Sequence, residues 1–341
     1  MDKKTELGQF YTTNYEYILS NMKIPSNVET IIEPFVGNGD LLKFIKNKSK
    51  FKIEIYDIDP KVENTIKQDT LEYPPDYTDK FVLTNPPFLA RNKSKNKKLY
   101  DKYACNDLYK CFIKIITVSQ CIGGIIIVPL NFLSSGRKSD VELRKEFLQK
   151  YRIKVVNIFE ETVFVDTTYT VCSIYFDRCV FNDELIDTFI YPNKRKIKIK
   201  LNDENDFTIG GEIFKLEQNP NYKIERATRQ NKNNITNILL KCIDDSIDSQ
   251  LGFTVVSDKE RFIDETEKLS ARSYATLLIN KKLTLEEQEI LVKKMNKYIK
   301  NQREKYNSLF LSNYRESNTI ARKRISFSLA FKICNYILSQ G

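Results

Sequence analysis

The chain contains no histidine among its 341 residues. Ser-His-Asp hydrolase triads and histidine-ligated metal sites are therefore excluded. The seven cysteines are odd in number and form no Cys-x-x-Cys pair, so neither a disulfide framework nor a zinc site is predicted. None of the cysteines follows a proline, so the Pro-Cys nucleophile used to methylate carbon 5 of cytosine is also absent.

Long apolar segments are absent as well. The longest, around residues 121–133, is interrupted by glycine and proline and is too short to span a bilayer. Residues 1–4 lack the apolar region of a signal peptide. We therefore predict an intracellular protein that makes no membrane contact, and 41% hydrophobic content is enough for one large core or two smaller ones.

The most informative segment is a tetrapeptide, Asn85-Pro86-Pro87-Phe88, which follows the apolar run of residues 81–84. Proline restricts φ and offers a carbonyl but no N–H, so the two prolines hold the local acceptor geometry. The Asn85 side-chain oxygen and the Pro86 carbonyl can accept the two protons of an amino group and draw its nitrogen toward tetrahedral geometry. The segment therefore indicates methylation of an amine, and the alternative is a turn that only ends a strand.

A second pattern lies upstream, where residues 33–39 join a short apolar strand to a Gly-x-Gly turn. Glycines there allow positive φ and close approach to a ligand, and residues 41–45 are predicted to be helical. The next strand ends in Asp57-Ile58, about 20 positions later, where nucleotide-binding α/β units hold ribose hydroxyls. Asp69 can accept a hydrogen bond from an adenine amine, or it is a solvated loop carboxylate.

Strand and helix patterns alternate up to about Arg178, which predicts an α/β fold with a doubly wound mixed sheet. After Arg178 the sequence pattern changes, and short strand-like segments follow between residues 185 and 201. A capping box at residues 284–287 starts a long helix. We therefore predict two domains, residues 1–180 and residues 181–341, the second of α+β type.

In order and spacing, these segments resemble S-adenosylmethionine-dependent DNA adenine-N6 methyltransferases of the gamma group, of the type II restriction-modification kind found in bacteria and large DNA viruses. The resemblance covers roughly residues 7–178, with Asn38 between the glycines and Phe88 in place of a frequent tyrosine as its departures. Three further motifs match: residues 8–12, 107–109 and 123–129. The resemblance implies a Rossmann-like class I methyltransferase fold followed by a DNA-recognition domain.

The resemblance also implies roles for single residues. The catalytic residues are Asn85, Pro86, Pro87 and Phe88, with Phe88 stacking on the substrate base. Phe164 supplies a second aromatic for a base rotated out of the duplex, although an aromatic before a strand is also a common core residue. The cofactor is S-adenosylmethionine, the product is S-adenosylhomocysteine, and no metal is implied. The implied cofactor contacts are Phe10, Tyr11, Thr12, Glu33, Pro34, Phe35, Gly37, Gly39, Asp57, Ile58 and Asp69.

Positive charge is clustered in two segments. Residues 91–102 hold six Lys or Arg against one Asp, and residues 291–341 hold eleven against two Glu. Such clusters suit a phosphate backbone through counterion release and charge-assisted hydrogen bonds, with a solvated surface as the alternative. The predicted DNA contacts are Lys93, Lys95, Lys97, Arg322, Lys323 and Arg324.

The predicted partner is duplex DNA. The resemblance implies a monomer that methylates a short palindrome one strand at a time, in a bacterial cytoplasm or an infected host cell, and it leaves open a cognate restriction endonuclease encoded alongside. Alternative acceptors are a protein glutamine or ribosomal RNA, although such enzymes usually need less chain than the about 160 residues beyond the catalytic domain. The cytosine amine is chemically close, but its enzymes more often place Ser first in the tetrapeptide. A non-enzymatic nucleic-acid binder on a degenerate fold is disfavoured by the intact cofactor and catalytic motifs.

Overall fold

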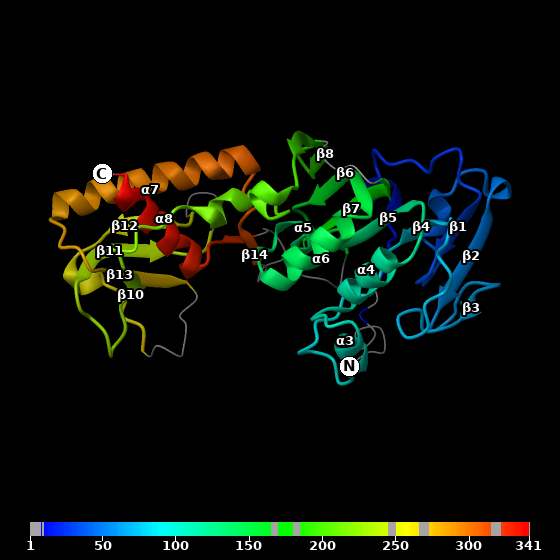
Figure 1. The fold of residues 1–341 in the computed structure, drawn as a ribbon, viewed down its shortest axis with the longest axis horizontal. Coiled ribbons are helices and arrows are strands. Elements are labelled where there is room, and N and C mark those ends of the chain that lie inside the picture. Colours follow the sequence, from blue (N-terminus) through cyan, green and yellow to red (C-terminus); the bar gives the residue numbers. More distant parts are fainter. Residues whose placement is uncertain are drawn as a thin grey trace. The chain divides into compact units, whose positions relative to one another are not determined.

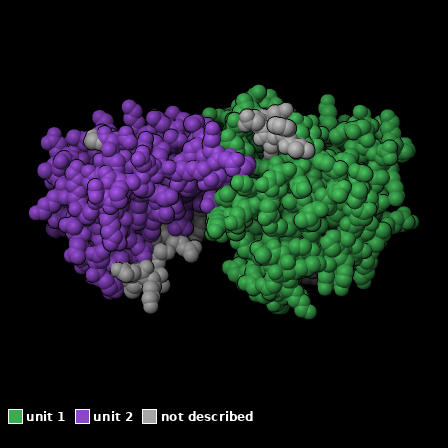
Figure 2. All heavy atoms as spheres, in the orientation of Figure 1, with its two compact units in different colours: residues 1–133, 137–202 green, residues 134–136, 203–341 purple. Residues whose placement is uncertain are grey.

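The computed structural model describes residue 8 and residues 10–164, 170–179, 185–244, 250–265, 273–314 and 322–340, with the side chains of residues 313, 314 and 322 left out. The chain divides into two compact units (Figure 2). The first comprises residues 1–133 and 137–202, and the second comprises residues 134–136 and 203–341. The main boundary thus lies after residue 202 and not after residue 180, because two further strands belong to the sheet of the first unit.

A nine-stranded mixed sheet forms the centre of the first unit, in the order β3-β2-β1-β4-β5-β7-β6-β8-β9 (Figure 1). Strands β1 to β5 pair in parallel, whereas β7 runs antiparallel to both β5 and β6. The strands are β1 (Thr30–Glu33), β2 (Lys52–Asp57), β3 (Ile66–Lys67), β4 (Phe81–Thr84), β5 (Gly123–Pro129), β6 (Tyr151–Phe159), β7 (Val171–Arg178), β8 (Ile186–Tyr191) and β9 (Arg195–Ile199). The predicted α/β fold with a doubly wound mixed sheet is confirmed.

The core of this unit lies around β4 and β5, in which every residue is buried. Apart from Thr84, both strands contain only apolar residues, glycine and proline, as expected for central strands that are covered on both faces. Helix α4 (Leu108–Val118) contacts helix α6 (Lys138–Leu148), and α6 packs against β6 (Figure 1). The shorter helices are α2 (Tyr15–Ile18), α3 (Lys98–Lys102) and α5 (Asn131–Ser134). The segment predicted to be helical after the glycine turn forms a 3-10 helix, Leu41–Phe44.

The sheet changes winding direction between β1 and β4, because the chain builds β2 and β3 on one side of β1 and then places β4 and β5 on the other. Loops at the carboxyl ends of two such strands diverge and leave a crevice where ligands bind. Glu33, Asp57 and Thr84 are the last residues of β1, β2 and β4. The segments that follow these three residues therefore meet at one edge of the sheet.

The second unit is an α+β structure. Its antiparallel sheet has the order β10-β13-β11-β12, and helix α7 begins at the predicted capping box, with Glu287 N donating to Thr284 Oγ1 at 3.2 Å. The elements are β10 (Ile224–Arg226), β11 (Ile235–Lys241), β12 (Gly252–Val255), β13 (Tyr274–Ile279), α7 (Leu285–Tyr306), β14 (Ser312–Tyr314), β15 (Arg322–Arg324) and α8 (Phe327–Ser339). Leu240, Phe253 and Met295 belong to a buried apolar cluster that joins this sheet to its helices.

Among the residues that the structure describes, no helix combines the length and the apolarity needed to cross a membrane. Within the same ranges, no group of three or more Cys, Asp or Glu side chains is arranged to hold a metal ion.

Candidate active site

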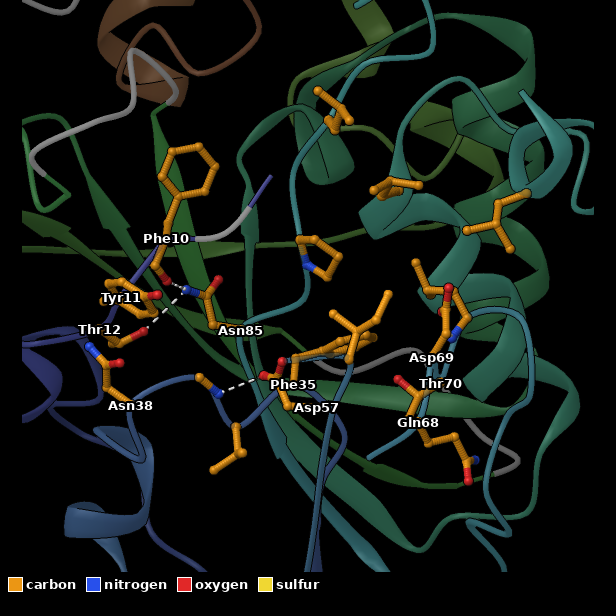
Figure 3. Close-up of a pocket in the computed structure, with 18 of the residues that line it drawn as sticks. Phe10, Tyr11, Thr12, Phe35, Asn38, Asp57, Gln68, Asp69, Thr70 and Asn85 are labelled. Atoms are coloured by element: carbon orange, nitrogen blue, oxygen red, sulfur yellow. Dashed lines mark hydrogen bonds between the residues drawn. The ribbon is translucent and has the colours of Figure 1, made fainter. Parts of the chain in front are cut away.

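A cavity of about 280 Å³ lies at the carboxyl ends of β1, β2 and β4, where the sheet topology predicts a ligand crevice. Figure 3 shows that Asn85 lies beside Thr12 at one end of the cavity and that Asp69 lies at the other end, with Asp57 between them. The predicted site residues in its wall are Phe10, Tyr11, Thr12, Phe35, Gly37, Asp57, Ile58, Asp69, Asn85 and Pro87. The tetrapeptide and the glycine turn, about 50 residues apart in sequence, thus share one cavity.

Other predicted residues lie outside this wall: Glu33, Pro34, Gly39, Pro86 and Phe88. Conversely, the wall contains residues that the sequence patterns did not assign to the site: Val36, Asn38, Asp40, Leu41, Gln68, Thr70, Leu71, Leu89, Ser94, Asn96, Leu99, Tyr100 and Leu108. Most of the additional residues adjoin a predicted motif, and that adjacency was the available signal. Ser94, Asn96, Leu99 and Tyr100 carry no such signal, because they come from the basic segment that follows the tetrapeptide.

The Asn85 side-chain amide is held in one orientation. Its Nδ2 donates to the Phe10 carbonyl at 2.8 Å and to Thr12 Oγ1 at 3.1 Å. A carbonyl oxygen can only accept, so the amide nitrogen must face Phe10 and Oδ1 must point away from it. Within the described part of the chain, Asn85 Oδ1 is buried and has no hydrogen-bond partner. Such an acceptor costs about 1–3 kcal/mol when it is left unpaired, which makes it a natural position for a ligand N–H group.

The two aromatic residues predicted to stack on a base are both buried, with Phe88 2% and Phe164 3% exposed. Both contact the Phe10 ring, which stacks on Phe88 at 5.5 Å between centroids and lies 6.3 Å from Phe164. Phe88 N also donates to the Gly8 carbonyl at 2.9 Å. The segment that contains Gly8 and Phe10 therefore covers Phe88, and another ring can stack there only when Phe10 moves.

The glycine turn and the end of β2 are hydrogen-bonded to each other. Gly37 has φ of +53° and Gly39 has φ of +77°, conformations that favour glycine. Gly37 N donates to Asp57 Oδ2 at 2.8 Å, and Asp59 N donates to Asp57 Oδ1 at 2.8 Å. Each carboxylate oxygen keeps capacity for a second donor, so this buried carboxylate can accept hydrogen bonds from adjacent hydroxyl groups of a ligand.

Glu33, the last residue of β1, is 1% exposed and lies outside the cavity wall. Its Oε1 accepts hydrogen bonds from the Thr84 hydroxyl and from Phe35 N, the latter at 3.1 Å, while Oε2 has no partner among the described residues. Burial raises the pKa of Glu33 from 4.5 to about 8, against the lowering effect of the two hydrogen bonds. Glu33 therefore links the ends of β1 and β4 as a carboxyl group that is largely protonated at neutral pH.

Asp69 organises the turn at the other end of the cavity. Its Oδ1 accepts hydrogen bonds from Leu71 N and Glu72 N, each at 3.1 Å. The adjacent Thr70 donates its hydroxyl to the Pro34 carbonyl at 3.0 Å. Pro34 thus supports the site through its main chain and ties the Asp69 turn to the glycine turn.

The predicted DNA-binding lysines of the first unit differ in their surroundings. Lys93 and Lys95 are exposed. Lys97 is half-buried, and its ammonium group donates to the carbonyls of Arg91 and Ser94. The charge run therefore contains both surface lysines and a lysine that binds its own main chain.

The predicted contacts of the second unit lie in β15. The Arg322 side chain and residues 315–321 lie outside the described residues. Lys323 is 7% exposed, and its carbonyl accepts from Asp244 N at 3.0 Å. Arg324 is half-buried. Lys323 is thus largely buried in this structure, and DNA contact by these residues stays a prediction.

No family model matches the chain, and no curated protein matches it. Several solved structures are similar to part of it. One is a modification subunit of a putative type I restriction enzyme from Vibrio vulnificus, with 17% identity over 57% of this chain and 49% of that chain and a TM-score of 0.42. Another is a putative class I S-adenosylmethionine-dependent methyltransferase from Listeria monocytogenes, with 15% identity over 52% of this chain and 61% of that chain and a TM-score of 0.38.

A third similar structure is the DrdV-DNA complex, with 14% identity over 71% of this chain and 36% of that chain and a TM-score of 0.42. The chain spans about half the length of the Vibrio vulnificus subunit.

Proposed function

We propose that this chain is an S-adenosylmethionine-dependent DNA methyltransferase that acts on the N6 amino group of adenine in duplex DNA. The observation that carries the proposal is the buried Asn85 Oδ1, an acceptor without a described partner, in the same cavity as the glycine turn and Asp57. The end of the cavity at Asn85 offers a hydrogen-bond acceptor for an amine. The rest of the cavity offers the Asp57 carboxylate and apolar side chains that can contact a nucleoside.

The residues of the cavity fit the proposed cofactor. Asp57 can accept hydrogen bonds from ribose hydroxyls, and Asp69 can accept one from an adenine amine. Ile58 and Leu71 supply apolar wall, and the turn at Gly37 lets the backbone approach a ligand closely. When bound, S-adenosylmethionine supplies an electrophilic methyl group on sulfur.

The chain's own residues then act on the acceptor amine. We propose that Asn85 Oδ1 accepts one N–H group of the amine and that the Pro86 carbonyl, although Pro86 lies outside the cavity wall in this structure, accepts the other, which leaves the nitrogen lone pair free to react. This interaction strengthens as positive charge develops on the nitrogen, so it favours the transition state over the bound substrate. As the N–C bond forms and the carbon–sulfur bond breaks, the nitrogen becomes strongly acidic and releases one proton to solvent, so the proposal needs no histidine or other general base beside the amine.

Adenine must leave the duplex to reach Asn85, which costs a few kcal/mol. Stacking of a base on an aromatic side chain returns about 1–3 kcal/mol. Because Phe10 already covers Phe88, an incoming base exchanges one stacked ring for another, and the net gain from Phe88 is smaller than that range. We infer that contacts to the DNA backbone provide much of the energy for base extrusion.

Exposed cations on both units support a polyanionic substrate. Lys93 and Lys95 are exposed on the first unit. Helix α7 carries a face of exposed lysines: Lys293, Lys294, Lys297 and Lys300. We propose that these groups contact phosphates and that a monomer methylates a short palindromic site one strand at a time.

The proposal is tested by incubating the full chain and methyl-labelled cofactor separately with unmodified duplex DNA, ribosomal RNA and a glutamine-containing protein substrate. Label in DNA alone, mapped by single-molecule sequencing to N6 of adenine at one short site, is the expected result. Label in RNA or in protein glutamine would overturn the assignment of DNA as the substrate. Label on the cytosine amine would overturn the assignment of adenine as the methylated base. DNA binding without any methyl transfer identifies a non-enzymatic binder.

A further inference from the structure

The basic segment after the tetrapeptide contributes directly to the cavity. Ser94, Asn96, Leu99 and Tyr100 all line it, although the charge of this segment predicted contact with DNA. These residues share the wall with Asp69. The segment therefore has one face toward the cavity and another, exposed face that carries Lys93 and Lys95.

Polar contacts hold this segment in a defined shape. The Lys97 ammonium donates to the carbonyls of Arg91 and Ser94, and Ser94 Oγ donates to the Asn96 carbonyl at 2.8 Å. Arg91 also pairs with Asp101 at 2.7 Å. A side chain that donates to two main-chain carbonyls draws together the two ends of a short loop. Lys97 thus stabilises the loop that presents Ser94 and Asn96 to the cavity.

The segment is also bound to the Asp69 turn. Lys102 Nζ donates to the Glu72 carbonyl at 2.7 Å, and the Tyr103 hydroxyl donates to the Leu71 carbonyl at 2.7 Å. Leu71 and Glu72 are the same two residues whose N–H groups bind Asp69. These contacts place the segment at the end of the cavity that is farther from Asn85.

Tyr100 closes the wall on its other side. It is 2% exposed, and its hydroxyl donates to the Leu89 carbonyl at 2.9 Å. Burial raises the pKa of Tyr100 to about 12, so the hydroxyl stays a neutral donor at physiological pH. Leu89 follows the tetrapeptide directly and lines the cavity itself. The wall therefore runs from the Asp69 turn to the tetrapeptide.

We propose that residues 94–100 form a wall of the nucleoside site and that Ser94 and Asn96 offer polar contacts to an adenosyl group. Lys97 is a positioning residue that holds this wall in place through the loop carbonyls. The proposal rests on the proposed function, because it takes an adenosyl cofactor as the ligand. Lys93 and Lys95, on the exposed face, are left as the residues of this segment that contact phosphate.

The test measures S-adenosylhomocysteine binding to the full chain by calorimetry in the absence of DNA. Lys97→Met keeps an apolar stem but removes the donors, and we expect it to weaken binding by about tenfold, equivalent to about 1.4 kcal/mol. Lys97→Arg keeps donors and should restore most of the affinity. Lys93→Met is the matched control and should change the dissociation constant by less than twofold.

Two further readouts separate this role from general destabilisation. Methylthioadenosine, which lacks the amino-acid part, should lose the same factor of affinity with Lys97→Met as S-adenosylhomocysteine does. In DNA binding, Lys93→Met should reduce the slope of log K against log salt by about one, whereas Lys97→Met should leave it unchanged. If Lys97→Met does not fold, Tyr100→Phe takes its place in both titrations, with the same direction of change expected, because it removes the hydroxyl that contacts the Leu89 carbonyl and the Ser94 side chain.

The outcomes distinguish the wall from the proposed function. If the wild-type protein binds neither adenosyl ligand, both the proposed cofactor and the proposed role of residues 94–100 are wrong. Wild-type protein that binds both, with Lys97→Met unaffected, overturns only the wall. A Lys97→Met variant that binds the cofactor normally but shows a reduced salt slope with DNA returns Lys97 to the role of a phosphate contact.

Discussion

Glu33→Gln tests whether a protonated carboxyl group joins the ends of β1 and β4. In the folded chain Glu33 keeps its proton up to about pH 8, while in the unfolded chain it releases the proton above its ordinary pKa of 4.5. Between these two values the unfolded state binds fewer protons, so the free energy of unfolding falls as pH rises. The stabilising effect is complete below pH 4.5 and is lost by about pH 8.

The size of the effect follows from the two pKa values. One pH unit of full protonation difference corresponds to about 1.4 kcal/mol, and Glu33 is half deprotonated at its folded pKa, so the wild-type chain should lose about 2 kcal/mol of unfolding free energy between pH 6 and pH 8. Burial also raises the pKa of Asp107, to about 6, but its contribution has the same sign and ends near pH 6. Because the chain has no histidine, no histidine titration overlaps the window from pH 6 to pH 8.

Glutamine has the shape of the protonated carboxyl group and keeps an oxygen that can accept from Thr84 and Phe35. Because glutamine does not titrate, Glu33→Gln should keep a level free energy of unfolding between pH 6 and pH 8, so its advantage over the wild type should grow by about 2 kcal/mol across this range. The assay is urea unfolding followed by circular dichroism, and the transition of the first unit is identified by its shift with S-adenosylhomocysteine. Asp107→Asn is the control, since it should reduce the pH dependence of the free energy of unfolding only below pH 6. Parallel stability curves for the wild type and Glu33→Gln would refute the protonated carboxyl group.

Three other changes probe the cavity. Asn85→Ala should lower kcat by about 10²–10³ in the methylation assay and leave S-adenosylhomocysteine affinity within about threefold, with the exposed Asn92→Ala as control; a loss of cofactor binding at unchanged kcat would reverse the role of Asn85. Thr12→Val removes one of the two acceptors that orient the Asn85 amide, so kcat should fall by about fivefold to tenfold, and an unchanged kcat would show that the Phe10 carbonyl suffices. Gly39→Ala places a Cβ 3.0 Å from Val62 at φ of +77°, and urea unfolding should show a loss of about 1–2 kcal/mol; an unaltered midpoint would mean that the turn relaxes.

Local sequence patterns were sufficient to predict the elements that carry the cavity. Apolar runs followed by glycine, aspartate or proline mark where β1, β2 and β4 end, and these signals depend on a few neighbouring residues. The carboxyl ends of parallel strands lie on one edge of a sheet, which is why Asp57 and Asn85 line the same cavity. The helical capping box at Thr284 is local in the same sense and lies where it was predicted.

Contacts between distant segments decided the features that these patterns missed. The first unit extends to residue 202 because β8 pairs with β6 in parallel and β9 pairs with β8, and strand pairing does not follow from the composition of either strand. Likewise, the sequence pattern of a basic segment does not show whether a given lysine side chain faces water or donates to a main-chain carbonyl group. The different surroundings of Lys93 and Lys97 therefore emerged only from the folded loop.

The sequence by itself thus determined that the glycine turn, Asp57 and Asn85 reach the crevice, because strand ends and turns are set by local chemistry. Only the tertiary structure decided their chemical state. The direction of the Asn85 amide depends on the Phe10 carbonyl, 75 positions away, and the protonation of Glu33 depends on its complete burial between two strands. Hydrogen-bond partners and local dielectric are properties of the packed molecule, since they arise from groups that the linear chain does not place side by side.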